Sequence, residues 1–389
     1  MKRLSTLLIA TLFVFAAQIA AQEIASPEQV MQKVADKLAA VKHLGYRYNF
    51  DYSVPSQNRS RVAQGVAFLD LKPEDGTSQF RFRFIFDDLD DTFNGTERFL
   101  IDKKGKKLYV ETKPLFKSFG NISLQNSPLS LKYALPKIIA DRSIPKKVTS
   151  IRMGGLDGYL VEFALYKGTL SSAGDIIETG PEMTNKYQLK VDKKTLLPVE
   201  VIETNDKGDE VLTTTYTEVS EKPIAPAGPS WYFSTYQNEY ALTKKEKLTL
   251  IESGKLAPAF KLAGFATGQT VSLDQYKGKL VLLEFWIAQC GFCIAAVPKL
   301  NETARKFKEK GLELVSVNMY DPAATIESFK KKNKPEFMIV TGGESIAAPY
   351  GVEAYPALVL IDRSGKVVYS SSGLFEKELE AAIMTNLQE

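Results

Sequence analysis

The only two cysteines among the 389 residues are Cys290 and Cys293, and their spacing limits how the chain is stabilised. A framework of structural disulfides would use more cysteines, spread along the sequence. A bridge between residues three positions apart closes almost no loop and adds little through chain entropy. With a hydrophobic content of 44%, the chain is expected to fold as a globular protein, and the cysteine pair is better explained by chemistry.

The first 21 residues are typical of a secretory signal. Lys2 and Arg3 form a positive start, residues 7–17 an apolar stretch, and Ala20 and Ala21 the small residues before a cut near Gln22. The apolar run is short for a membrane span, and an uncleaved anchor is the alternative. We expect an exported protein, periplasmic or otherwise extracytoplasmic, that is soluble after cleavage.

The charge balance gives no reason to expect nucleic-acid binding. The chain has 50 basic and 46 acidic residues, and removal of Lys2 and Arg3 would leave 48 basic residues. The lysine-rich stretches are short and are expected to be solvated surface.

Residues 23–222 predict a largely antiparallel sheet with an N-terminal helix, an α+β arrangement. Ser26 and Pro27 favour a helix start, and apolar residues follow at helical spacing up to Val41. In 80–86 four phenylalanines occupy alternate positions, as on one face of a strand, and 98–110 is typical of a hairpin.

Residues 223–253 begin with a proline-rich stretch and are expected to be a linker and bridging segment. From 254 to 389 the pattern alternates between strands and helices, which favours an α/β sheet with an antiparallel hairpin and a helix at its end. The strands are expected at 280–286, 312–318, 337–340, 357–362 and 366–370. Helices are expected after the first strand up to residue 310, near 323–332 and from 376, with a short one between the strands at 337–340 and 357–362.

Cys290 follows the apolar strand 280–286 and opens a helix, which is where a reactive thiolate is stabilised. Cys290 is expected to attack, and Cys293, one turn into the helix, to resolve the mixed disulfide. Half of a zinc site is the rival interpretation, but it needs two more ligands and the only histidine is His43. An inert structural bridge is the other alternative. The sequence predicts neither a metal nor another cofactor.

The segments 255–260, 273–279 and 284–293 together resemble the TlpA/ResA group of thioredoxin-like exported reductases. Pro298 lies where that fold kinks its active-site helix, and Tyr355-Pro356 is similar to its cis-proline loop, which binds the substrate chain. The 63 residues from Cys293 to Pro356 leave room for the extra helix-strand crossover of that group. The resemblance covers about 250–389 and implies a thioredoxin fold with a TlpA-type insertion.

The chain also departs from that group. Gln289 replaces the tryptophan that usually precedes the first cysteine, and Gly291-Phe292 lacks the proline of thioredoxin. Ala296 stands where ResA-like proteins place an acid. Glu284 matches the buried aspartate of thioredoxin, where burial should raise its pKa and let it exchange a proton with Cys293; a carboxylate facing water is the alternative.

The remaining candidates have weaker roles. Trp286 could border the substrate groove together with Gln289, Gly291 and Phe292, although core packing beside the site is the alternative for Trp286. Tyr355 is a further groove candidate, with plain packing as its alternative. Ile287 occupies the position where peroxiredoxin chemistry needs a hydroxyl, so peroxidase activity is not expected.

Residues 23–222 contain no catalytic cluster. One amphipathic helix, many strands and a late turn at 191–198 resemble the LolA/LolB group of lipoprotein carriers, which are curved sheets, or half-barrels, closed by helices around an apolar cavity. The phenylalanines of 80–86 would then line a ligand cavity; alternatively they form the core of the sheet.

These patterns together predict an exported thiol–disulfide oxidoreductase that reduces disulfides in extracytoplasmic proteins. Its reducing power would come from a membrane thiol-reductase electron donor, because the compartment lacks the cytosolic thiol pool. A disulfide oxidase or isomerase remains open. So does a protein that mainly binds an apolar ligand or partner through 23–222, with an accessory redox domain.

Overall fold

The computed structural model describes residues 26–55, 59–74, 76, 78–114, 119, 124–179, 182–244 and 248–388. The predicted secretory signal lies outside these residues. Within them, no helix has both the length and the apolar character needed to cross a membrane.

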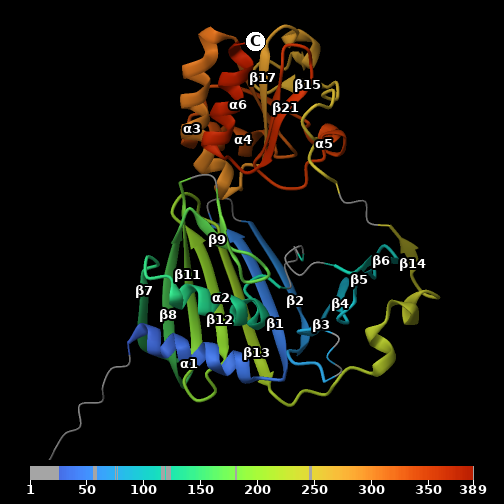
Figure 1. Cartoon of the computed structure of the whole chain (residues 1–389), viewed down its shortest axis with the longest axis vertical. Helices are drawn as coiled ribbons and strands as arrows, with labels where there is room; N and C mark the ends of the chain where they lie inside the picture. Colours follow the sequence, from blue (N-terminus) through green and yellow to red (C-terminus); the bar gives the residue numbers. More distant parts are fainter. Residues whose placement is uncertain are drawn as a thin grey trace, which may run out of the picture.

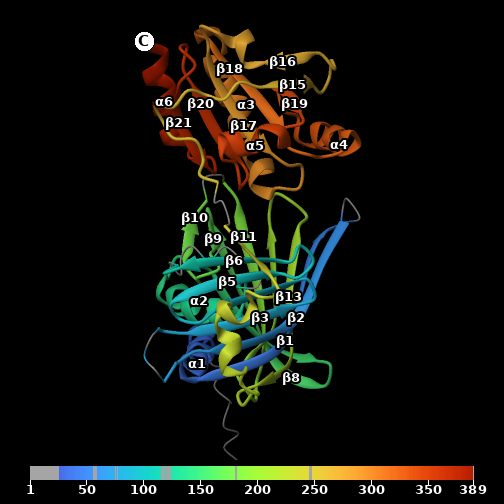
Figure 2. The same ribbon diagram turned by 90° about the vertical axis from the view of Figure 1, so that its right-hand side faces the viewer.

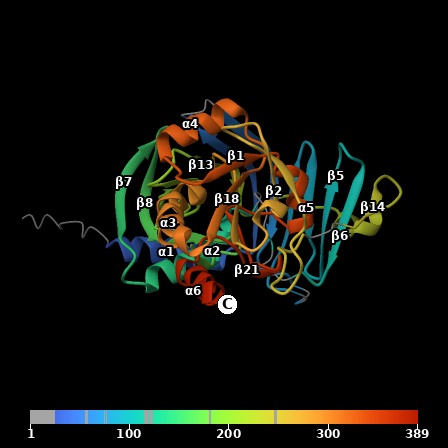
Figure 3. The same cartoon turned by 90° about the horizontal axis from the view of Figure 1, so that it is seen from above.

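The N-terminal part forms a curved sheet of 12 strands in the described part of the chain (Figures 1 and 3). Its order is β14-β6-β5-β4-β3-β2-β1-β13-β12-β11-β8-β7, and all neighbours are antiparallel except β14 and β6. The strands are β1 (His43–Val54), β2 (Arg59–Asp70), β3 (Arg81–Phe86), β4 (Leu89–Phe93), β5 (Glu97–Asp102), β6 (Lys107–Thr112), β7 (Lys146–Met153), β8 (Leu156–Tyr166), β11 (Thr184–Asp192), β12 (Pro198–Asn205), β13 (Val211–Ser220) and β14 (Ala241–Thr243). Beside it lies a small hairpin of β9 (Gly168–Leu170) and β10 (Ile176–Glu178).

Helices α1 (Pro27–Ala40) and α2 (Pro128–Ala140) cover one face of this sheet (Figure 1). The predicted start of α1 is confirmed, because Ser26 and Gln29 form a capping box that satisfies the first free N–H groups. The apolar faces of both helices and the inward side chains of the strands form one hydrophobic core, which includes Phe80, Phe82 and Phe84. The mainly antiparallel sheet and the hairpin of β5 and β6 follow the sequence prediction.

The proline-rich segment at 223–253 also packs on the large sheet. It contains the short 3-10 helices η3 (Gly228–Trp231) and η4 (Phe233–Tyr236), and then adds β14 to the edge of the large sheet by parallel pairing with β6. Trp231 is 8% exposed, packs edge-on against Phe68 and lies under the guanidinium of Arg81. The segment is therefore anchored on the sheet along much of its length.

The C-terminal part is a thioredoxin fold. Its seven-stranded sheet, counted over the described residues, has the order β16-β15-β19-β18-β17-β20-β21. The strands are β15 (Lys261–Gly264), β16 (Thr270–Ser272), β17 (Leu280–Trp286), β18 (Leu312–Asn318), β19 (Met338–Thr341), β20 (Ala357–Ile361) and β21 (Val367–Ser372). The helical elements are η5 (Leu273–Tyr276), α3 (Gly291–Phe307), η6 (Lys308–Lys310), α4 (Ala323–Asn333), α5 (Glu344–Tyr350) and α6 (Glu376–Gln388).

The central strand β17 is buried along its whole length because helices cover both faces of the sheet. Alternate residues serve two clusters: Val281, Leu283 and Phe285 face one side, and Leu280 and Leu282 pack with α3 and α6 on the other. The end of β17 and the start of α3 point toward one end of the large sheet (Figures 1 and 2). This arrangement positions the cysteine pair between the two sheets.

Candidate functional site

Cys290 and Cys293 form a disulfide at the N-terminus of α3. Their Cα atoms are 5.1 Å apart, and Cys290 is the N-cap residue of the helix. The backbone N–H of Cys293 donates to Sγ of Cys290 at 3.0 Å. After reduction, the same N–H and the positive end of the helix dipole would stabilise a thiolate at Cys290.

The two sulfur-bearing residues differ in exposure. Cys293 is fully buried, in a cluster with Trp286 and Val297, whereas Cys290 is only partly buried. An incoming disulfide can therefore approach Cys290 but not Cys293. This asymmetry fits an attacking and a resolving thiol.

Glu284 is buried in the middle of β17, as the apolar run on both sides predicts. The residue is 2% exposed, and its carboxylate accepts a hydrogen bond of 2.8 Å from Oγ of Ser316 on the neighbouring strand β18. Burial raises the pKa of Glu284 to about 7, and the bond from Ser316 opposes part of that rise.

Strand alternation places Glu284 on the face of β17 that α3 covers. Leu282 packs with Ala296 and Leu300 of α3, and Trp286 clusters with Cys293. Since residues two apart on a strand share a face, Glu284 lies between these contacts, beneath the first turns of α3. A carboxyl group there that titrates near neutral pH is suited to exchange protons with the buried thiol.

The peptide bond between Tyr355 and Pro356 is cis, and Pro356 is buried directly before β20. Tyr355 is half-buried and packs against the cluster that contains Trp286 and Cys293. Burial raises the pKa of its hydroxyl, so Tyr355 stays protonated at neutral pH. The loop is thus placed beside the cysteine pair, as the resemblance implied.

Trp286 lies too deep to border a substrate groove. It is 1% exposed, and its ring centroid is 4.1 Å from that of Phe329. Its geometry fits the alternative role of core packing, in which Trp286 contacts the first turns of α3.

Asp321 is a residue that the sequence reasoning missed. Its Oδ2 accepts bonds of 2.7 Å from the backbone N–H of Ala288 and from Nδ2 of Asn318. Asn318 in turn accepts from the N–H of Asp321. This carboxylate fixes the loop between β17 and α3, and the sequence signal for it is an Asn-x-x-Asp turn that starts at the last residue of β18.

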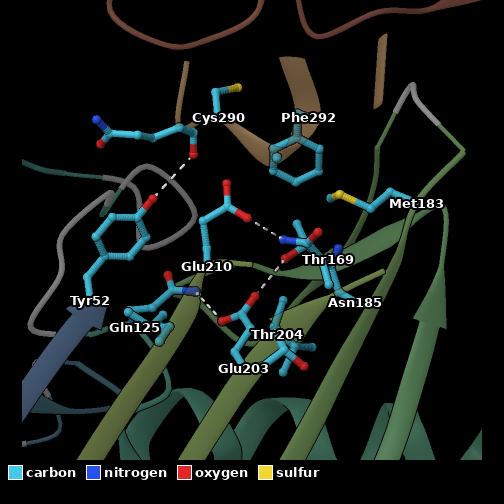
Figure 4. A pocket seen from close by; sticks show the side chains of 15 residues that line it. Tyr52, Gln125, Thr169, Met183, Asn185, Glu203, Thr204, Glu210, Cys290 and Phe292 are labelled. Carbon is cyan, nitrogen blue, oxygen red and sulfur yellow. Dashed lines mark hydrogen bonds between the residues drawn. The ribbon is translucent and has the colours of Figure 1, made fainter. Parts of the chain in front are cut away.

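Cys290 borders a cavity of about 390 Å³ whose other wall is formed by the N-terminal part of the chain (Figure 4). From the redox side, Gln289, Cys290, Gly291 and Phe292 line it. From the sheet side it is lined by Tyr52, Gln125, Thr169, Leu170, Met183, Asn185, Glu203, Thr204, Asn205, Glu210 and Leu212. The hydroxyl of Tyr52 donates to the carbonyl of Gln289 at 3.3 Å and ties the two walls together. No local sequence pattern pointed to this cavity, because its two walls come from distant segments.

Known proteins match the C-terminal part of the chain. Residues 252–386 match the family model described as Redoxin. The thiol-disulfide oxidoreductase ResA of Bacillus thuringiensis is 35% identical over 147 residues, which cover 38% of this chain and 82% of that protein. ResA of Geobacillus thermodenitrificans is 33% identical, over 33% of this chain and 75% of its own length.

A solved structure, the thioredoxin domain of a thiol-disulfide oxidoreductase from Bacteroides vulgatus, aligns at 27% identity. The alignment covers 34% of this chain and 99% of that structure, and its TM-score is 0.31. With the cysteine pair bonded at the start of α3 and a ResA protein matched over most of its length, the chain belongs, through its C-terminal part, to the ResA family of thiol-disulfide oxidoreductases.

Proposed function

We propose that this protein is an extracytoplasmic reductase that transfers electrons to disulfides of exported proteins. In this proposal the chain has a signal at 1–21, a sheet domain at 23–222, a connecting segment at 223–253 and a redox domain at 254–389. A membrane thiol reductase would regenerate the dithiol, because the compartment has no cytosolic thiol pool.

The observation that carries the proposal is the difference in exposure between the two cysteines. Cys290 would attack the substrate disulfide and form a mixed disulfide, and the buried Cys293 would release the product by attacking Cys290. Glu284 would accept or return the proton of Cys293, and the loop at Pro356 would hold the substrate chain.

The test is reduction of insulin by the full chain, with dithiothreitol as the electron source. Cys290→Ser should abolish the activity, and Cys293→Ser should accumulate mixed disulfides whose partners mass spectrometry can identify. A Cys290→Ser variant that still reduces insulin would contradict the mechanism.

The direction of electron flow needs a separate measurement. Equilibration of the pair with glutathione buffers gives its reduction potential, and a potential below that of the glutathione pool supports a reductase. A potential well above it would support the oxidase or isomerase alternative.

The proposal of an apolar ligand in a LolA-like cavity has less support. Phe82 packs against Phe84, Phe93 and Phe119, with centroids 5.4 to 6.0 Å apart, and is fully buried. These rings fill space between the sheet and its helices. A lipid-sized adduct on the intact chain in native mass spectrometry would favour the ligand nonetheless.

A further inference from the structure

The cavity beside the cysteine pair is negatively charged. Among the described residues that line it, the charged side chains are Glu203 and Glu210, and none is basic. A buried carboxylate is costly unless donors or a cation compensate it, so the partners of these two groups decide what the cavity can bind.

Glu203 is already satisfied by the protein. Its carboxylate accepts bonds from Asn126 and Tyr187 at 3.1 and 2.9 Å, and longer ones from Gln125 and Thr169 at 3.3 and 3.4 Å. These four donors supply about as many hydrogen bonds as a carboxylate accepts, so Glu203 has a structural role.

Glu210 is different. It is 9% exposed, and its Oε2 accepts a bond of 3.0 Å from Nδ2 of Asn205. Its Oε1 is buried and has no hydrogen-bond partner among the residues that the structure describes. Buried polar atoms in native proteins are nearly always paired, so an unpaired one on a residue that lines a cavity indicates a missing partner.

The unpaired oxygen lies next to the redox centre. A Cβ atom added to Gly291, the first residue of α3, would stand 3.3 Å from Oε1 of Glu210. Figure 4 shows the Glu210 side chain rising from the sheet toward the turn that carries Cys290 and Phe292. A substrate group that binds Oε1 would therefore lie beside Gly291, the residue that follows Cys290, and close to the substrate sulfur that Cys290 attacks.

We propose that Glu210 is a specificity-determining residue of the exchange site, which selects disulfides that carry a cationic nitrogen close to sulfur. The inference rests on the proposed function, since it names the substrate class of that site. The cation would pair with Oε1 of Glu210 and would offset the repulsion between this carboxylate and the attacking thiolate. A small amine-bearing disulfide and a peptide cysteine next to lysine share this chemistry.

The exchange balances without another reactant. The thiolate of Cys290 attacks one sulfur of the substrate, so the substrate S–S bond breaks and one thiolate leaves and takes up a proton. Cys293 then attacks Cys290, the mixed disulfide breaks, and the second thiol leaves. The enzyme dithiol loses two electrons and two protons, and the substrate disulfide gains them.

The experiment is a single turnover of the pre-reduced full chain against two matched disulfides, cystamine and bis(2-hydroxyethyl) disulfide. They have the same two-carbon arms and differ in an ammonium against a hydroxyl group. The measured quantity is the ratio of the two rate constants in each enzyme variant, because intrinsic differences between the reagents cancel when variants are compared.

Glu210→Gln should lower the cystamine preference about tenfold, the factor expected for losing one charge-assisted hydrogen bond. Glu210→Asp keeps the charge and should retain part of the preference. The matched control is Glu218→Gln on β13, the strand that follows Glu210, since Glu218 is exposed and paired with Arg47; its ratio should equal that of the parent. Two disulfide-linked peptides that differ in Lys or Gln beside cysteine then distinguish a peptide substrate from a small one.

An unchanged ratio in Glu210→Gln would overturn the assignment and leave the proposed function intact. Failure of both reagents to oxidise the parent enzyme would also overturn the assignment, and loss of insulin reduction would separately contradict the proposed function.

Discussion

Replacing Glu284 by glutamine should remove a large part of the pH dependence of stability. Burial raises the pKa of Glu284 from 4.5 to about 7 in the folded chain, while the unfolded chain keeps the ordinary value. Between these values the folded state binds more protons, so the free energy of unfolding falls as pH rises. The contribution is fully present below pH 4.5 and is lost by the time pH has passed 7.

The size of the effect follows from that difference. One pKa unit corresponds to about 1.4 kcal/mol, so the parent should lose about 3 kcal/mol relative to Glu284→Gln between pH 4.5 and 8. The glutamine is neutral throughout, and any cost of burying its amide is independent of pH and drops out of the comparison.

The assay is urea unfolding of the oxidised chain at several pH values. Both proteins would carry Trp231→Phe, so that Trp286, which lies two residues after Glu284, is the only tryptophan that reports. Glu378→Gln, on the exposed side of α6, makes the same change in charge and should leave the pH dependence unaltered. If the free energy of unfolding changed with pH in the same way in the parent and in Glu284→Gln, the reasoning would be refuted, because the carboxylate would then ionise without a burial penalty.

Three further changes test neighbouring contacts. Ser316→Ala removes the bond that opposes the raised pKa of Glu284, so in the same titration the fall in stability should still begin near pH 4.5 but should extend to higher pH and become larger. Leu300→Ala empties a fully buried site under α3 and should cost about 2–5 kcal/mol in urea unfolding; a cost under ~1 kcal/mol would mean that the core collapses around it. Tyr52→Phe removes the bond to the Gln289 carbonyl and should speed hydrogen exchange in the loop before α3, whereas unchanged exchange would show that this bond does not hold the loop.

Local patterns predicted the redox part well. The bounds of β17 and β18 agree with the expected strands to the residue, because each is a short, mainly apolar run that begins directly after a polar or glycine residue. The burial of Glu284 follows from the same run. The helix that starts after Cys290 and the turn at Pro356 are determined by residues close to them in sequence, so the sequence alone predicts them.

Features that depend on distant contacts were not predictable. Strand β14 has only three residues, too few for a pattern, and it exists because β6 offers an unpaired edge. Tyr52 and Gln289 are 237 positions apart, and nothing in either segment indicates that they meet. The position of Glu210 opposite Gly291 likewise depends on how the end of the large sheet meets α3.

The shared cavity also has a consequence for how such a protein can diversify. Its reactive wall is encoded by four adjacent codons, 289–292, whereas its opposite wall is encoded by several separate stretches in the first 212 residues. Mutations or recombination events that replace the end of β12 and the start of β13 would change that wall and leave the cysteine motif untouched. With Glu210 as the proposed specificity residue, reaction chemistry and substrate choice would be encoded by different stretches of one gene and could be selected largely independently.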